Sequence, residues 1–299
     1  MLIYDAYPRY VGDVYRPPSE AGSLILQVMY GCPYNECTFC GMYAGKPFRL
    51  RPFAEVREDV ESLAISLKQR TTRVFLADGD ALALPVRSLL RVLDLLHSEL
   101  PHLERVGSYA NAQSLLRRSG DELIQLRERG LDMLYLGLES GDEETLARTG
   151  KGVSAARQIE ACRGAREAGF RLSLMAILGL GGVERSLEHA RATGRALSAI
   201  DPDYASMLSL MLVPGTLLAE AVERGEFIVP DALGMLRELR EIIALTEVTH
   251  TVFRTTHASN YLAIEGTLPG DKAKMLQVID TVLERGDPAL LRPEFSRRL

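Results

Sequence analysis

Short apolar runs alternate with helically spaced apolar residues along most of this chain. Nearly continuous apolar runs are typical of strands buried on both faces. They cover residues 23–29, 73–77, 105–109, 132–137, 171–178 and 204–213. Segments with apolar residues three or four positions apart, typical of amphipathic helices, separate most of these runs. The alternation predicts parallel strands with helices outside them.

Helix boundaries follow from the spacing and from capping residues. We expect helices over residues 53–69, 86–100, 121–129, 154–168 and 183–200. Asp121 is the expected N-cap of the third helix and Ser154 of the fourth. Further helices are expected over residues 217–224, 232–246 and 271–285, with another strand at 251–255.

These elements predict an α/β fold of six strand–helix units. The connections between the units are too short to form separate domains. The spacing of roughly 30 residues per strand–helix unit fits a barrel and a doubly wound sheet equally well. We divide the chain into a leader that packs on the core, a core, and a smaller, mostly helical extension. These parts cover residues 1–22, 23–215 and 216–299.

Composition narrows the class of protein. The chain has 299 residues, of which 46% are hydrophobic and 25% charged, so a sizeable core is expected. A net charge of −5 does not favour a broad nucleic-acid surface. Residues 1–5 lack the basic start of a secretory signal, and apolar runs such as 172–180 are too short to span a membrane. We therefore expect a cytoplasmic protein, in which clustered cysteines are metal ligands or catalytic groups.

Three of the four cysteines, Cys32, Cys37 and Cys40, lie within nine residues of each other. A structural zinc site would need a fourth ligand. The remaining Cys162 lies in a predicted helix, where a small buried hydrophobe is expected. Three thiolates in one loop suit an iron–sulfur cluster in which one iron has no protein ligand and can bind a further molecule.

The loop resembles the cluster motif of the radical S-adenosylmethionine (radical SAM) superfamily. That family usually has three and then two residues between its cysteines, with an aromatic residue before the last one. Phe39 supplies the aromatic residue, while the first gap here holds four residues. The resemblance extends over residues 23–215. It implies a partial (β/α)6 barrel of the TIM type, one [4Fe–4S] cluster and bound S-adenosyl-L-methionine (SAM).

The resemblance also implies SAM contacts at the ends of later strands. Asp78-Gly79-Asp80 corresponds to the segment that receives the SAM amino group, and Glu139-Ser140 to one that reaches the ribose or methionyl part. Gly179 and Gly181 lie in the segment that resembles the adenine contact, and Asn111 follows the third strand. All follow predicted strands, whose carboxyl ends carry the active site in parallel barrels.

Substrate contacts are less specific in the sequence. Tyr43 follows the cysteine motif, Arg16 precedes the first strand, and His257 and Asn260 lie in a polar segment after the last predicted strand. Each has an ordinary structural alternative: a packed aromatic for Tyr43, a surface charge for Arg16 and a polar turn for the other two. Lys151, between two glycines, is either a mobile contact or a solvated loop lysine, and the second interpretation is favoured.

The function implied by the resemblance is reductive cleavage of SAM. The resulting 5′-deoxyadenosyl radical would abstract hydrogen from a substrate, for which a small molecule is the residual hypothesis. A reducing partner such as flavodoxin or ferredoxin is expected, and neither nucleic acid nor membrane is. A non-catalytic iron–sulfur electron carrier is the alternative, and a zinc-stabilised binding module is a third class. Because no second cysteine group exists, we expect a single cluster.

Overall fold

A computed structural model describes residues 8–298, so the expectation for residues 1–5 falls outside the described part of the chain. The chain divides into two units, and each unit holds part of the main sheet. The first unit comprises the chain up to Asn35, Met42–Leu136 and Ala161–Arg171. The second comprises Glu36–Gly41, Gly137–Glu160 and the chain from Leu172 onward.

Parallel strands form the sheet of the first unit. Their order is β1 (Leu24–Gln27), β4 (Arg73–Ala77), β5 (Arg105–Ala110) and β6 (Leu131–Glu139), whose last three residues belong to the second unit. Leu26 lies opposite Leu76, and Leu76 lies opposite Ser108. Side chains alternate between the two faces of each strand. Phe75 and Tyr109 therefore share a face, where their rings meet edge to face with centroids 5.1 Å apart.

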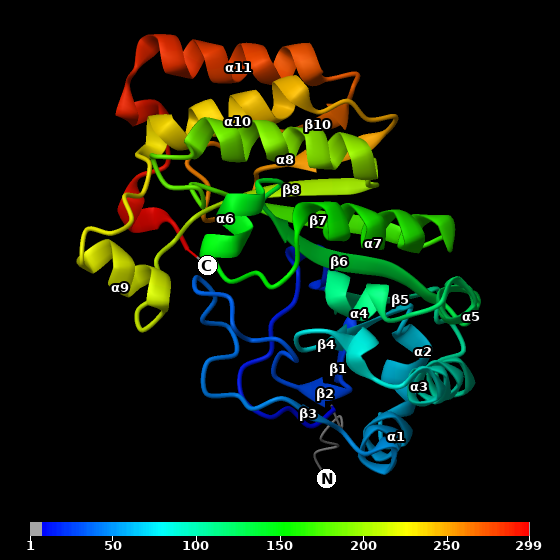
Figure 1. Ribbon diagram of the computed structural model, residues 1–299. Helices are drawn as coiled ribbons and strands as arrows, with labels where there is room; N and C mark the ends of the chain where they lie inside the picture. The colour runs from blue at the N-terminus through cyan, green and yellow to red at the C-terminus, as the bar shows by residue number, and fades with distance from the viewer. Residues whose placement is uncertain (1–7, 299) are drawn as a thin grey trace. The chain divides into compact units, whose positions relative to one another are not determined.

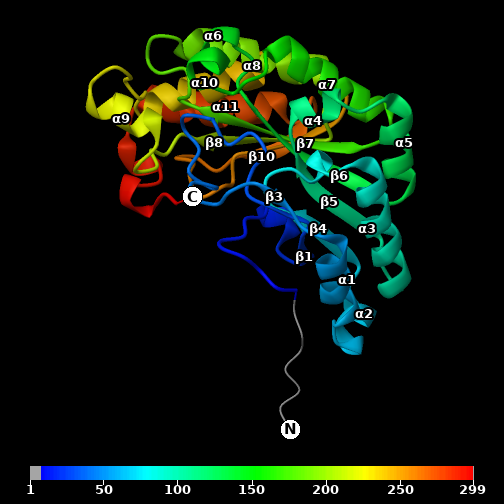
Figure 2. The ribbon, with the colours of Figure 1, turned by 60° about the horizontal axis from the view of Figure 1, so that its bottom comes forward.

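The longest helix of the first unit buries one apolar side. Leu89, Leu93 and Leu96 lie on one side of α3 (Val86–Glu99) and are fully buried. Each such side chain contributes roughly 1.5–3 kcal/mol by leaving water. Figure 2 shows α3 beside α1 and α5. The remaining helices are α1 (Phe53–Glu61), α2 (Ile65–Arg70), α4 (Ala112–Leu116) and α5 (Gly120–Glu128).

Two expectations for this unit are wrong in detail. Residues 53–69 form two helices, because the backbone is extended at Ala64 while Leu63 is buried. No glycine or proline marks this break, which tertiary burial decides. The helix expected to begin after Asp121 begins at Gly120 instead. Ser119 is its N-cap and forms a capping box with Glu122, which satisfies two terminal N–H groups reciprocally.

The second unit continues the strand–helix alternation. Strands β7 (Arg171–Leu178), β8 (Tyr204–Ser209) and β9 (Thr251–Arg254) run parallel, and β10 (Glu265–Leu268) pairs antiparallel with β9. Helix α10 (Ala232–Leu245) lies beside α8 (Ser186–Ile200) and α11 (Lys272–Arg285), as Figure 1 shows. The other helices are α6 (Glu143–Arg148), α7 (Ala155–Glu167) and α9 (Leu217–Glu223). Among residues 8–298, no helix has the length and apolar character needed to cross a bilayer.

The α/β class, the six parallel strands and the helical carboxyl-terminal part are confirmed. Several ends are shorter than expected: β8 stops at Ser209 and α8 starts at Ser186. The expected strand at 251–255 is present as β9, whereas β10 was not anticipated. Its sequence, Glu265-Gly266-Thr267-Leu268, carries only one strongly apolar residue. A strand at the edge of a sheet can form by backbone pairing without an apolar pattern.

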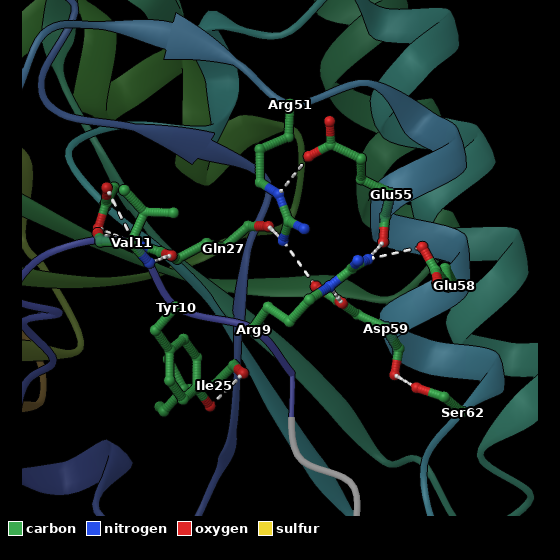
Figure 3. A network of polar contacts seen from close by, with 11 residues as sticks. Arg9, Tyr10, Val11, Ile25, Gln27, Arg51, Glu55, Glu58, Asp59 and Ser62 are labelled. Carbon is green, nitrogen blue, oxygen red and sulfur yellow. Dashed lines mark hydrogen bonds and ion pairs between the residues drawn. The ribbon is translucent and has the colours of Figure 1, made fainter.

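A network of polar contacts ties the amino-terminal segment to β1 and α1 (Figure 3). Asp59 of α1 is buried, accepts a hydrogen bond from Arg9 (2.5 Å) and pairs with the buried Arg51 (2.8 Å). The Arg51 guanidinium also donates to the Gln27 carbonyl (2.8 Å). Val11 and the Gln27 side-chain amide exchange two hydrogen bonds, of 2.8 and 3.2 Å. Two buried charges thus satisfy each other at the first strand.

Replacing Asp59 tests this network. Asp59→Asn leaves the Arg51 charge buried without its main partner, so we expect a loss of about 3 kcal/mol in the free energy of unfolding. Glu61→Ala, which removes one partner of an exposed ion pair, should change it by less than about 0.5 kcal/mol. Urea unfolding of both variants measures the difference. Equal losses would show that burial of the pair does not matter.

Candidate functional site

The cysteine loop connects two short paired strands. β2 (Met29–Tyr30) and β3 (Arg49–Leu50) run antiparallel, with Tyr30 opposite Arg49. Cys32, Cys37 and Cys40 lie between them, each half-buried and none in a disulfide. The Cys40 backbone N–H donates to the Cys37 carbonyl (3.1 Å), which makes a turn of the two-residue gap. Most of the loop has no regular structure, so its position depends on anchors from other elements.

Asp78, directly after β4, anchors the start of the loop. This fully buried carboxylate accepts a hydrogen bond from the Gly31 backbone (2.9 Å) and two from the Gln27 amide (both 3.2 Å). Lys46, near the end of the same loop, pairs with it at 2.7 Å. Asp78 has a φ of +70°, in the left-handed region that costs a non-glycine residue roughly 1 kcal/mol or more. The contacts to both ends of the loop offset that strain.

Gly79 lies against the first cysteine. Its N–H donates to the Gly31 carbonyl (2.9 Å), while the Gly31 N–H donates to Asp78. Both backbone polar groups of Gly31 are therefore hydrogen-bonded to the end of β4. A Cβ on residue 79 would lie 2.7 Å from the Cys32 Cα and 2.8 Å from the Cys32 Cβ. Carbon atoms that are not bonded do not approach so closely. Only glycine therefore allows the end of β4 and the first cysteine to meet in this way.

The second half of the loop is anchored in the second unit. The Thr38 N–H donates to the Thr149 carbonyl (2.9 Å), and the Thr38 carbonyl accepts from the Leu218 N–H (2.9 Å). Thr149 follows α6, and Leu218 lies in the first turn of α9. Cys37 and Cys40 flank this doubly held threonine closely in sequence. The anchors thus fix the backbone between the second and third cysteines.

Asp80 and Asn111 both cap helices. Asp80 is fully buried and accepts from the Leu82 N–H (3.0 Å) at the start of a 3-10 turn, Ala81–Ala83. Burial raises the pKa of Asp80 to about 7, and hydrogen bonds from Ser114 and from the Leu82 and Asn111 backbones oppose the rise. The Asn111 side chain accepts from the Ser114 N–H (2.8 Å) at the start of α4. A contact of either side chain with SAM stays a prediction.

Glu139, the last residue of β6, pairs with Lys151. Their Oε1 and Nζ atoms are 2.9 Å apart, and both side chains are only 13% exposed. Burial would lower the pKa of Lys151. The negative charges of Glu139, Cys37 and Cys40 outweigh it and raise that pKa. The interpretation of Lys151 as a solvated loop lysine is therefore wrong: it is a buried cation near two of the thiols.

Ser140, Gly179 and Gly181 lie among buried partners. The Ser140 hydroxyl contacts His189 Nδ1 (2.7 Å), and the Gly179 N–H donates to Glu238 (2.6 Å). A Cβ on Gly181 would lie 2.9 Å from the Cβ of His189. The ends of β6 and β7 are therefore both held by side chains of later helices.

The expected substrate residues have different surroundings. Arg16 is exposed. Phe39, which is expected at the cofactor and not at the substrate, is half-buried. Tyr43 is buried with its ring edge to face with Tyr15 (5.8 Å), which is the packed-aromatic alternative. The buried Asn260 side chain donates to the Met207 and Thr255 carbonyls and accepts from Ser209. Its contacts hold the loop after β9 against the end of β8.

His257 is the more accessible member of that loop. Its Nδ1 accepts from the Ser259 N–H (3.2 Å) and lies 2.9 Å from the Ser259 hydroxyl. Burial lowers the pKa of His257, and the positive charge of Arg292 lowers it further. The imidazole is then neutral near pH 7 with its proton on Nε2. A substrate contact by this group stays a prediction.

Sequence reasoning did not single out two buried titratable residues, His189 and Glu238. His189 and Glu238 are fully buried in α8 and α10. On a helical pattern, one polar residue among apolar ones gives a weak signal. Glu238 stands between Leu236 and Leu239 on the apolar side of its helix, which is the one feature that could have identified it.

The donor chemistry of the loop fits an iron–sulfur cluster. Three thiols are available, and each half of their loop is held by backbone hydrogen bonds. Residues 8–298 contain no set of three His, Cys, Asp or Glu side chains gathered tightly enough for a single metal ion. Thiolates are the usual ligands of a [4Fe–4S] cluster, and the Gly79 contact leaves the first cysteine close to the end of β4.

Comparison with known proteins agrees with this chemistry. A family model described as the radical SAM superfamily matches residues 26–192, more than half of the chain. The heme chaperone HemW of Bacillus subtilis is 22% identical over 175 residues, covering 58% of this chain and 46% of the relative. The uncharacterized methyltransferase PH0819 of Pyrococcus horikoshii is 26% identical over 199 residues, covering 66% and 41%. The chain spans less than half the length of these curated relatives.

Solved structures share the fold. Coproporphyrinogen III oxidase (HemN) from Escherichia coli superimposes with a TM-score of 0.54 at 19% identity, over 74% of this chain and 51% of that one. Methylornithine synthase (PylB) gives a TM-score of 0.52 at 19% identity, over 75% of this chain and 63% of that one. At this identity the likeness concerns the fold alone.

The contact between Gly79 and Cys32 can be tested directly. In Gly79→Ala the new methyl group must displace the first cysteine, so we expect a loss of about 2 kcal/mol in stability and less iron bound per chain. Gly120→Ala, at a helix position with no atom within 4 Å, should be neutral or stabilising by about 0.5 kcal/mol. Iron and sulfide analysis after anaerobic reconstitution compares the two. Normal iron content in Gly79→Ala would contradict the contact.

Proposed function

The chain belongs to the radical SAM superfamily, and on this premise we propose that it abstracts hydrogen from a small-molecule substrate. Members of this superfamily are enzymes that use a [4Fe–4S] cluster and SAM. Because the chain spans under half the length of its curated relatives, the substrate and partners are part of the proposal. Cluster and SAM together supply a 5′-deoxyadenosyl radical when both are bound.

The anchored cysteine loop carries this proposal. Cys32, Cys37 and Cys40 would hold the cluster, and the CX4CX2C spacing leaves no fourth cysteine nearby. Asp78 and Gly79 hold the loop at its first cysteine. A loop held so firmly by buried groups can keep three thiolates in place without a fourth protein ligand. One iron would then remain open for SAM.

The chain's own residues would bind and orient SAM. We propose that the Asp78-Gly79-Asp80 segment receives the SAM amino group and that Glu139 accepts hydrogen bonds from the ribose. Ser140, Asn111 and Phe39 complete these contacts, and the segment of Gly179 and Gly181 receives the adenine. Lys151 would have two roles, since it fixes the Glu139 carboxylate and places a positive charge near two thiolates. A nearby cation stabilises thiolates in a low-dielectric setting.

A small-molecule substrate remains the hypothesis with the most support. The net charge of −5 argues against extended contact with nucleic acid. Tyr43, Arg16, His257 and Asn260 are the proposed substrate contacts, of which His257 offers a half-buried imidazole N–H. Flavodoxin or ferredoxin is the proposed electron donor.

Cysteine variants test the proposed reaction. Anaerobically reconstituted protein reduced with dithionite should convert SAM to methionine and 5′-deoxyadenosine, measured by chromatography. Cys32→Ala, Cys37→Ala and Cys40→Ala should each lose cluster iron and this product almost entirely, because each removes one of only three thiolates. Cys162→Ala is the matched control, since Cys162 is buried in α7 and lies outside the motif in sequence.

Three outcomes would contradict the proposal. Cluster formation without SAM binding or cleavage would favour a non-catalytic electron carrier. Full activity in any of the three motif variants would exclude that cysteine as a cluster ligand. Loss of iron in Cys162→Ala to the same extent would indicate general unfolding instead of a specific ligand set.

A further inference from the structure

Glu238 makes an unusual contact with the end of β7. Its carboxylate is fully buried on α10, and its two oxygens accept hydrogen bonds from the Gly179 backbone (2.6 Å) and the Ser186 hydroxyl (2.7 Å). Gly179 has a φ of +85°, and a Cβ there would lie 2.7 Å from the Met235 side chain, one turn earlier on α10. Helix α10 therefore holds this glycine by both packing and a hydrogen bond.

His189 lies next to the same carboxylate and contacts the end of β6. Its Nε2 lies 3.9 Å from Glu238 Oε2, and its Nδ1 lies 2.7 Å from the Ser140 hydroxyl. Ser140 also accepts from the Asp142 N–H (2.9 Å). Two buried polar pairs therefore lie side by side without a hydrogen bond between them: Glu238 with Gly179, and His189 with Ser140.

Few charged groups lie near Glu238 and His189. Among the described residues, no lysine or arginine pairs with Glu238, and the only titratable group facing it is His189. Asp142 also faces His189, but Arg185 holds it in a bidentate pair (2.9 Å for both bonds). A buried carboxylate without a cation destabilises a fold, so its presence here calls for a functional reason.

We propose that Glu238 is a positioning residue for SAM: its ionised carboxylate fixes the segment at Gly179, next to the His189 that holds the segment at Ser140. The inference rests on the proposed function, which makes these two segments SAM contacts. A charged acceptor holds an N–H roughly twice as strongly as a neutral one. The ionised form therefore holds the Gly179 backbone more firmly than the protonated form does.

Electrostatics acts in the same direction. SAM has a sulfonium, an ammonium and a carboxylate, so it carries net positive charge at neutral pH. Ionised Glu238 adds a negative charge to the unit that holds both segments. By linkage, a ligand that favours the ionised form binds more tightly as pH rises through the pKa of the group. Burial raises the pKa of Glu238 to about 7, against hydrogen bonds from Ser186 and Gly179, so the change falls near neutral pH.

Glu238→Gln removes the negative charge of the side chain and keeps its size and shape. The amide oxygen can still accept from the Gly179 N–H, and the amide nitrogen can donate to the Ser186 hydroxyl, so both links survive without a charge. We expect this variant to bind SAM as wild type does at about pH 6 and about fivefold more weakly at about pH 8. Anaerobic calorimetry with SAM and the cluster-loaded protein measures both affinities. Titration of SAM itself is common to both proteins and cancels in their ratio.

A stability measurement distinguishes positioning from a merely structural role. Native Glu238 has a raised pKa, so its ionisation weakens the fold as pH rises from about 4.5 to about 7. Glu238→Gln should therefore resist urea better than wild type at about pH 8, although it binds SAM more weakly there. Glu184→Gln, an exposed residue, is the matched control and should change neither. A structural residue would lose stability and affinity together.

Ser186→Ala provides an independent variant should Glu238→Gln fail to fold. It removes a hydrogen bond that favours the ionised carboxylate, so the pH midpoint of the affinity change should move upward. Wild type that binds no SAM would overturn the proposed function. If wild type binds SAM but the ratio of its SAM affinity to that of Glu238→Gln does not vary with pH, only the role of Glu238 is overturned. An unmoved midpoint in Ser186→Ala would do the same.

Discussion

A single buried carboxylate, Asp78, holds the start of the cysteine loop. The loop is mostly irregular and polar, so it cannot keep its shape by burying apolar surface of its own. Asp78 compensates by joining the Gly31 backbone, the Gln27 amide and Lys46 at one point. Removing such a group would leave several buried donors unsatisfied at once. The position of Cys32, and with it the cluster, depends on that point.

Close backbone approach is the second constraint. Gly79 lets the end of β4 touch Cys32, and Gly179 lets α10 touch the end of β7. In both places a strand end must lie against another element with no side chain between them. The side chains that follow these glycines, Asp80 and Leu180, are fully or almost fully buried. The strand ends therefore offer backbone atoms more than side chains to a ligand.

Buried charges of the second unit gather near the segments that are proposed to bind SAM. Glu139 pairs with Lys151, while the one titratable group beside Glu238 in the described part of the chain is the imidazole of His189. Burial opposes the charge of Lys151, but the surrounding negative charges raise its pKa, whereas burial raises the pKa of Glu238 to about 7. The first arrangement suits a constant contact and the second suits a contact that responds to pH. Glu139 and Glu238 therefore have different electrostatic surroundings within the same unit.

The sequence by itself determined the class of fold and the kind of chemistry. Alternating patterns predicted the six parallel strands, because burial on both faces leaves a continuous apolar run, and the spacing of Cys32, Cys37 and Cys40 indicated a cluster loop. Only the tertiary structure decided which polar groups meet. The sequence favoured a solvated loop lysine for Lys151, between two glycines, and did not single out His189 and Glu238 at all. Their partners lie up to 59 residues away in sequence, and such contacts depend on packing that no local pattern records.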